Sequence, residues 1–207
     1  MIDLYVERTG PGVFNEPFNT FSNLSFIIAA WALWRYASTR RAVTPGIVTL
    51  IALVAFIGVG STVFHMFATQ WALALDVLGI IAFLLAYLWL FSRNVLHASQ
   101  PLTIAVVVLY FAASYAAIAF PLGLGRSAGY IPALLFLLAF GVYLAVRGRG
   151  EKRLLLVAAG VFSASLAART VEYHLTGILP MGSHFIWHLL NGVTLYLAVR
   201  AYAAERI

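Results

Sequence analysis

Seven long apolar segments, separated by short polar or helix-breaking stretches, dominate the chain. They cover roughly residues 18–37, 46–67, 70–92, 102–120, 130–147, 153–173 and 183–203. Each is close to the roughly 20 apolar residues that a helix needs to cross the hydrocarbon core of a bilayer. Proline and glycine mark the breaks, at Pro45-Gly46, Pro101, 121–129, Gly148 and Pro180. The pattern predicts an all-α fold, an integral membrane bundle of seven transmembrane helices in which residues 1–207 form a single domain.

The composition supports a membrane protein and excludes several other classes. Hydrophobic residues make up 63% of the 207 residues and charged residues only 10%, whereas a soluble domain has about 25% charged residues. The chain has no cysteine, which excludes disulfides and thiolate metal sites. Its net charge of +6 is spread between apolar segments, which argues against nucleic acid as a partner. No basic region precedes the first apolar segment, so we expect no cleavable signal peptide.

The basic residues predict the orientation of the bundle. Of the 13 Lys and Arg residues, Arg8, Arg126 and Arg169 belong to the side of the N-terminus. The rest lie near the loops after segments 1, 3 and 5 or in the C-terminal tail: Arg35, Arg40, Arg41, Arg93, Arg147, Arg149, Lys152, Arg153, Arg200 and Arg206. Because cytoplasmic loops are rich in Lys and Arg, we expect the N-terminus outside the cytoplasm and the C-terminus inside. The short loops are typical of a bacterial plasma-membrane protein.

Histidines near the ends of two apolar segments are the strongest chemical signal. His184 and His188 open the last segment, and residues at i and i+4 share a helix face, with Cβ atoms about 6 Å apart. His65 closes the second segment, and Ser61 lies four residues before it. Asp76 follows near the start of the third segment, where a carboxylate needs a partner or a metal. Counted from an outside N-terminus, all these helix ends lie at the same extracytoplasmic depth.

Three histidines and one aspartate form the residue set expected of catalytic zinc. Since zinc lowers the pKa of a bound water to about 7, the pattern predicts a hydrolytic zinc site formed by His65, His184 and His188. Asp76 would accept the proton of the water, and Ser61 would donate a hydrogen bond to the developing oxyanion. Two alternatives stay open: a buried hydrogen-bond network that joins the helices, and haem ligation by His65 and His188, which leaves Asp76 unexplained.

Other polar residues in the apolar segments have simpler interpretations. Glu16, Asn19 and Ser22 fall on one helical stripe, which predicts either contacts that join helices or a direct functional role. Arg169 and Glu172, at i and i+3, predict an ion pair that holds a helix end. The fourth and fifth segments carry no visible chemistry, so we expect them to form a lipid-facing wall.

These motifs resemble those of the alkaline ceramidase family, within the superfamily of seven-helix hydrolases that includes adiponectin- and progestin-receptor-like proteins. The resemblance covers nearly the whole chain. Residues 16–23 resemble the opening motif of helix 1, residues 61–65 match Ser-x-x-x-His, and residues 184–188 match His-x-x-x-His. The resemblance implies zinc held by the three histidines, Asp76 as the base and Ser61 beside the reacting carbonyl. The implied reaction is hydrolysis of ceramide to a fatty acid and a sphingoid base.

The resemblance also implies a second ion. Eukaryotic members of the family bind calcium through an acidic N-terminal segment and a Glu at the start of helix 1, and Glu7 and Glu16 fit that pattern. Asp3 is displaced by one position, and the residues that flank Glu7 differ from those of the family. Because calcium prefers six or more oxygen ligands, Asp3, Glu7, Glu16 and backbone carbonyls would have to supply them.

Two classes of function fit these observations. The first is a zinc-dependent hydrolase that acts on ceramide, or a related N-acyl lipid, entering from the bilayer. The alternative is a receptor-like or scaffolding protein with a structural metal site, although the short tails argue against signalling. A transporter would need helix breaks near the midplane. Only Gly58 and Gly60 suggest one, and two small residues there predict close helix packing instead.

Overall fold

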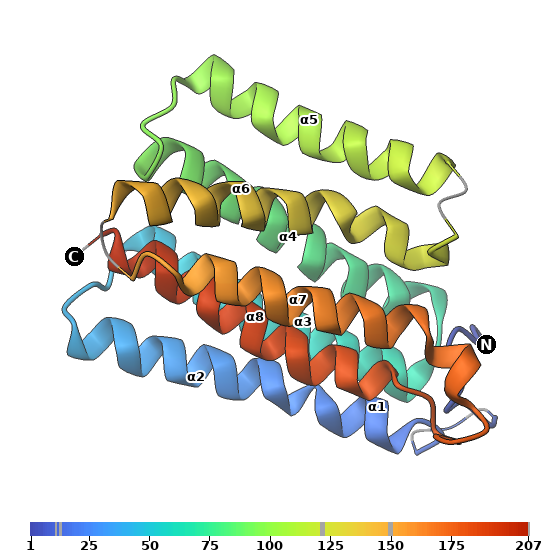
Figure 1. Cartoon of the computed structure of the whole chain (residues 1–207). Coiled ribbons are helices and arrows are strands. Elements are labelled where there is room, and N and C mark those ends of the chain that lie inside the picture. The colour runs from blue at the N-terminus through green and yellow to red at the C-terminus, as the bar shows by residue number, and fades with distance from the viewer. Residues whose placement is uncertain (11, 13, 121–122, 149–150, 207) are drawn as a thin grey trace.

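The chain folds into a bundle of long helices that run up and down along one another (Figure 1). The structure is a computed structural model that describes residues 1–10, 12, 14–120, 123–148 and 151–206. Its helices are α1 (Pro17–Ser22), α2 (Leu24–Thr39), α3 (Pro45–Phe67), α4 (Gln70–Asn94), α5 (Gln100–Ala119), α6 (Ile131–Arg147), α7 (Leu154–Thr170) and α8 (His184–Ala204), with short 3₁₀ turns η1 (Gly125–Tyr130) and η2 (Glu172–Leu175). Since α1 and α2 together make up the first predicted segment, the described residues form the seven helical segments that the sequence predicts. The all-α fold class is confirmed.

Local signals explain where the helices begin and end. Thr44 precedes Pro45 and caps α3 by accepting a hydrogen bond from the backbone N–H of Ile47, with an O–N distance of 3.4 Å. Proline suits the first turn of a helix because it has no N–H to leave unpaired. At the other end of α3, Ala68 adopts a left-handed conformation with φ of 49° and turns the chain directly into α4. The short connection confirms α3 and α4 as a tight antiparallel pair.

Helix α8 lies inside the bundle, where it packs against α7, α2, α3 and α1. Helix α5 lies at the edge (Figure 1), and only Thr103 and Tyr110 of its residues are buried, as expected of a lipid-facing wall. Helix α6 is better integrated than predicted, because Phe140 and Leu144 are buried and Gly141 lies against Leu156 of α7. The two ends of the chain lie at opposite ends of the bundle.

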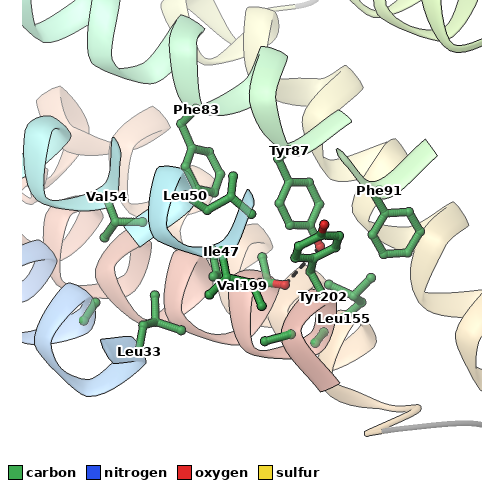
Figure 2. Packing of buried hydrophobic residues seen from close by; sticks show 14 of the residues in the cluster. Leu33, Ile47, Leu50, Val54, Phe83, Tyr87, Phe91, Leu155, Val199 and Tyr202 are labelled. Atoms are coloured by element: carbon green, nitrogen blue, oxygen red, sulfur yellow. Dashed lines mark hydrogen bonds between the residues drawn. The ribbon is translucent and has the colours of Figure 1, made fainter. Parts of the chain in front are cut away.

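The apolar core occupies the half of the bundle nearer the C-terminus (Figure 2) and continues toward the histidines as far as Phe26, Ile57 and Trp187. The ring of Phe91 stacks on that of Phe140 with centroids 4.2 Å apart. The hydroxyl of Tyr87 donates to the backbone oxygen of Ala198 over 3.0 Å, so the polar atom of this buried ring is satisfied. The other half of the bundle holds most of the buried polar side chains.

Four stretches are long and apolar enough to cross a membrane: α3, α4, α5 and Ser127–Arg147, which contains α6. Helix α7 is a shorter apolar helix of 17 residues, and α2 has 16. These helices support a membrane-embedded protein. In water, their exposed apolar side chains would form an unusually large hydrophobic surface.

Candidate metal centre

Three histidines from two helices meet at the end of the bundle that also holds the N-terminus. His65 lies in the last turn of α3, and His184 and His188 in the first two turns of α8. One ring nitrogen of each lies within 4.8 Å of the corresponding nitrogen of the other two. In the described part of the chain, no other group of three or more His, Asp or Glu side chains comes so close together. The sequence prediction that these residues converge is confirmed.

Two serines fix the beginning of α8, which carries two of the histidines. The hydroxyl of Ser25 in α2 donates to the backbone oxygen of His188 over 2.9 Å. The hydroxyl of Ser165 in α7 donates to the backbone oxygen of Trp187 over 3.1 Å. Gly192, one turn further, lies against Ser25 so closely that an added Cβ would stand 2.8 Å from its Cβ. The backbone that carries His184 and His188 is therefore held from both sides.

Glu16 orients the ring of His65. Its Oε2 lies 2.5 Å from His65 Nδ1, and an ionised carboxylate only accepts hydrogen bonds. Nδ1 of His65 therefore carries a proton and donates it to Glu16, while Nε2 is buried and has no hydrogen-bond partner among the described residues, which leaves Nε2 as the ring nitrogen that could bind a metal. A histidine whose second nitrogen binds a carboxylate is the usual arrangement for a metal ligand.

Ser22 orients His188 in the same way. The Ser22 hydroxyl donates to the backbone oxygen of Asn19 over 3.0 Å, so at 2.8 Å it accepts the proton of His188 Nδ1. This leaves Nε2 of His188 unprotonated. His184 stacks on Tyr5, with ring centroids 3.7 Å apart, and its buried Nδ1 has no partner among the described residues.

The histidine group fits a metal ion. Its rings are at most 2% exposed, and buried polar atoms without partners are rare in native proteins. Here two such nitrogens belong to one cluster, and the second nitrogens of His65 and His188 already have partners. Three imidazoles are also a ligand set typical of catalytic zinc. Glu16 and Ser22 of the polar stripe contact histidines on two other helices, so the predicted contacts that join helices are confirmed, and a direct functional role stays a prediction.

Glu16 also forms a buried ion pair with Arg8, whose Nε donates to Glu16 Oε1. The same guanidinium donates through NH2 to the backbone oxygen of His65 over 2.7 Å. Both side chains are about 1% exposed. Arg8 therefore balances the charge of Glu16 and ties the N-terminal segment to the end of α3.

The three carboxylates of the implied calcium site have separate environments. Glu7 accepts hydrogen bonds from the backbone N–H groups of Phe18 and Asn19, over 2.6 and 2.8 Å, and so caps the first turn of α1. Glu16 binds Arg8 and His65, and Asp3 is exposed. The described residues do not bring the three carboxylates together as a metal-binding group. Calcium binding stays a prediction from the resemblance.

Asp76 and Ser61 face a cavity of about 360 Å³ that adjoins the histidines. Both residues line it together with His184 and His188, and the side chain of Ser61 interacts with the carboxylate of Asp76, as do the charges of His65 and Arg169. Gly60 permits this approach, since an added Cβ would stand only 3.1 Å from the backbone oxygen of Leu75. The rest of the wall is largely apolar, with Ile80, Phe83, Leu84 and Leu195 among its residues.

The predicted ion pair between Arg169 and Glu172 is wrong. Arg169 makes no ion pair with any described residue, and its guanidinium lies over the rings of Tyr130 and Trp187, 5.3 and 4.9 Å from their centroids. Glu172 instead accepts a hydrogen bond from the backbone N–H of Val6 over 3.1 Å. The 3₁₀ turn η2, which begins at Glu172, moves this side chain off the face of α7.

Sequence reasoning missed several residues around the histidines. From the sequence, Arg8 is only one of the basic residues that predict orientation, and Tyr5 has no assigned role. A buried Glu16 requires a cation nearby, and Arg8 lies within the short segment that precedes it. That requirement was the available signal for Arg8, whereas the stacking of Tyr5 on His184 depends on tertiary structure.

Comparison of the sequence with models of known protein families and with curated proteins gave no match.

Proposed function

We propose that the protein is a zinc-dependent hydrolase that cleaves the amide bond of ceramide, or of a related N-acyl lipid, within the membrane. The products are a fatty acid and an amine. The observation that carries the proposal is the buried group of His65, His184 and His188, of which His184 and His188 line a largely apolar cavity. A site of this kind suits a substrate with one polar bond and a long hydrocarbon chain.

The three histidines would hold the ion through Nε2 of His65 and His188 and a ring nitrogen of His184. A bound zinc ion polarises a carbonyl and lowers the pKa of a water molecule to about 7. The second nitrogens stay with Glu16 and Ser22, so the rings keep their orientation whether or not an ion is present. Such preorganisation is what a catalytic site requires of its supporting residues.

Asp76 and Ser61 supply the remaining chemistry. Asp76 lies in the wall of the same cavity, where its carboxylate accepts a proton from the attacking water and passes it to the departing nitrogen. The hydroxyl of Ser61 donates a hydrogen bond to the carbonyl oxygen as negative charge develops on it. Both residues come from the α3–α4 pair, so their spacing is set by a single tight turn.

The membrane setting supports the same class of substrate. Helices α3 to α6 provide the spans, and we extend this to all seven segments, with the N-terminus and the histidines on the extracytoplasmic side. The proposed topology follows from the concentration of Lys and Arg at the other end of the chain. The resemblance of residues 16–23, 61–65 and 184–188 to alkaline ceramidase motifs supports ceramide-like lipids as substrates.

The test combines metal analysis with hydrolysis of lipid amides by the purified protein. We expect about one zinc per chain, and activity that is lost in His188→Ala together with the metal. Asp76→Asn should retain the metal and lose activity by a factor of about 100 or more. Stoichiometric zinc without hydrolysis of any N-acyl lipid would contradict the proposal. Full activity in Asp76→Asn would contradict the assignment of the base.

A further inference from the structure

Arg169, at the end of α7, carries an unpaired positive charge in the wall of the catalytic cavity. No hydrogen bond or ion pair joins its guanidinium to another residue in the described part of the chain. Only the rings of Tyr130 and Trp187 hold it, through cation–π contacts. The residue is partly exposed and borders the cavity. An arginine has five N–H donors, so the guanidinium of Arg169 is free to bind a ligand that enters the cavity.

The nearby carboxylates do not fill this role. Asp76 and Glu172 interact with Arg169 electrostatically, but neither forms an ion pair with it. Asp76 is engaged with Ser61, and Glu172 with the backbone of Val6. The two carboxylates therefore balance part of the charge at a distance and leave the donors of Arg169 free for an anionic group in the cavity.

Three adjoining cavities indicate how a substrate would be oriented in the site. The catalytic cavity shares Phe83, Leu84 and Leu195 with a small apolar cavity of about 70 Å³ that reaches toward Tyr87 and Phe140 in the core. On its other side it shares Tyr5 and Arg169 with a third cavity of about 380 Å³, which is bordered by the loops at the histidine end.

An acyl chain fits the direction of the small cavity, because the lining there is almost entirely apolar, whereas Arg169, Thr170 and Glu172 border the third cavity. The part of the substrate beyond the amide nitrogen must then lie toward Arg169 and the third cavity. Arg169 is thus placed to contact the amine side of the substrate rather than its acyl chain.

We propose, on the basis of the proposed function, that the preferred substrates are N-acyl amino acids, whose carboxylate binds Arg169. Arginine matches a carboxylate with two parallel hydrogen bonds. The neutral hydroxyls of ceramide would leave the guanidinium charge unbalanced. In the reaction, the oxygen of water bonds to the acyl carbon and the C–N bond breaks. The nitrogen takes up a proton, which releases a fatty acid and a free amino acid.

Binding of two matched, non-hydrolysable ligands tests the inference without depending on activity. One is an N-acylglycine and the other an N-acylethanolamine of the same chain length, each with its amide N–H replaced by CH₂. The resulting keto acid and keto alcohol differ only in the charged group. Wild-type protein should bind the acid about tenfold or more tightly than the alcohol. Arg169→Gln should lose this preference, and Arg169→Lys should retain part of it.

Arg153→Gln is the matched control, because it removes an exposed arginine from the other end of α7 and should keep the preference of the wild type. Arg169→Lys also guards against misfolding, since it retains the charge. Equal binding of the two ligands by the wild type, or an unchanged preference in Arg169→Gln, would overturn the inference. Hydrolysis of ceramide and of N-acylglycine at equal rates would also overturn the inference, but it would leave the proposed function intact. A preference for the acid without hydrolysis of any amide would support the inference and contradict the proposed function.

Discussion

The carboxylate of Glu16 lies between two partners, the guanidinium of Arg8 and the imidazole of His65. Its side chain is about 1% exposed, so an uncompensated charge there would be strongly destabilising. Arg8 compensates the charge, which allows the carboxylate to stay ionised and to accept the proton of His65 Nδ1. The ion pair is therefore best understood as support for one ligand of the metal centre.

Glu16→Gln should weaken metal binding without removing a ligand. An amide is neutral, so Arg8 loses its counter-charge and the hydrogen bond to His65 becomes weaker. Loss of such a supporting group typically lowers metal affinity about 10- to 100-fold. Competition with a chelator, followed by metal analysis, measures the change.

Asp3→Asn is the control for this substitution, because Asp3 is an exposed carboxylate of the same N-terminal segment. It should leave the affinity for zinc at the wild-type value. Equal affinities for wild type and Glu16→Gln would contradict the supporting role. Loss of bound calcium in both variants would instead favour the calcium site that the resemblance implies.

Glu172 predicts a specific dependence of stability on pH. Burial raises the pKa of its carboxyl to about 7, whereas the unfolded chain has the ordinary value of about 4.3. The folded state therefore favours the protonated form. The stability this confers is fully present below about pH 4.3 and is lost as the pH rises through about 7.

Glu172→Gln removes this titration and keeps an oxygen that accepts the Val6 N–H. Its Tm should therefore rise relative to that of the wild type between about pH 5 and pH 8. Thermal unfolding of both proteins in one pH series measures the difference in Tm. The contributions of the titratable groups that the two proteins share cancel in this difference. A difference that stays constant across the series would contradict the prediction.

At the residue scale, sequence spacing located the ligands but not most of their partners. The i, i+4 spacing of His184 and His188 fixes a common face, and the helix ends give a common depth with His65. Spacing along one helix says nothing about contacts with another, which is why Ser22 was not assigned to His188. The incorrect ion pair between Arg169 and Glu172 has a different cause. Residues at i and i+3 face each other only while the helix continues, and α7 ends at Thr170.

At the scale of elements, close packing of α3 against its neighbours depends on two glycines. An added Cβ at Gly58 would stand 2.9 Å from the Cβ of Phe26 in α2, and one at Gly60 would stand 3.1 Å from the backbone oxygen of Leu75 in α4. The prediction of close packing at these glycines is confirmed. Gly58 lies three residues before Ser61 and Gly60 directly precedes it, which links helix packing directly to the geometry of the site.

Gly60→Ala should therefore destabilise the protein and disturb catalysis. The new methyl group meets backbone rather than a flexible side chain, so α4 must move away by a few tenths of an ångström. We expect a loss of about 1–3 kcal/mol in stability and lower hydrolysis with the zinc content unchanged. Thermal unfolding, metal analysis and activity measure the three effects.

The same substitution at Gly160 of α7 is the control, because nothing lies within 4 Å of an added Cβ there. Gly160→Ala should keep full activity and, since alanine favours helices, should not lose stability. Equal stability and equal activity of Gly60→Ala and Gly160→Ala would show that close contact between α3 and α4 at Gly60 is not required for stability or hydrolysis.

The predicted first helix is interrupted between α1 and α2, which the apolar pattern did not reveal. The backbone oxygen of Asn19 accepts hydrogen bonds from the side chains of Ser22 and Asn23, over 3.0 and 2.8 Å. These side chains compete with the backbone N–H that would continue the helix. Hydrophobic periodicity predicts which face of a helix is buried and how long the helix is. It cannot predict that side-chain donors will compete with a backbone N–H for one carbonyl oxygen.

At the scale of the whole molecule, the buried polar side chains gather at one end of the bundle, whereas the apolar core runs along it. Most of the buried polar groups lie with the histidines at the N-terminal end, and the core continues from the C-terminal end as far as Phe26 and Trp187. The lengths and limits of the segments were predictable because proline, glycine and apolar runs specify them locally. The order in which the helices pack against one another was not predictable, since seven similar apolar helices can be arranged in many ways.

The proposed topology is open to direct labelling, because the chain has no cysteine. Single cysteines at Thr9 and Lys152, both exposed and at opposite ends of the bundle, provide the probes. In intact cells, Thr9→Cys should react with a membrane-impermeant maleimide, and Lys152→Cys should react only after permeabilisation. The reverse pattern would place the histidines on the cytoplasmic side.

Two of the three ligands are carried by α8, which also contributes Val199 and Tyr202 to the core at its far end. The spacing between His184 and His188 is thus set within a single helix. The position of His65 relative to them depends instead on how α3 packs against α8, and Arg8 joins the N-terminal segment to the end of α3 through the backbone oxygen of His65. An ion held by all three rings would therefore act as a cross-link between α3 and α8.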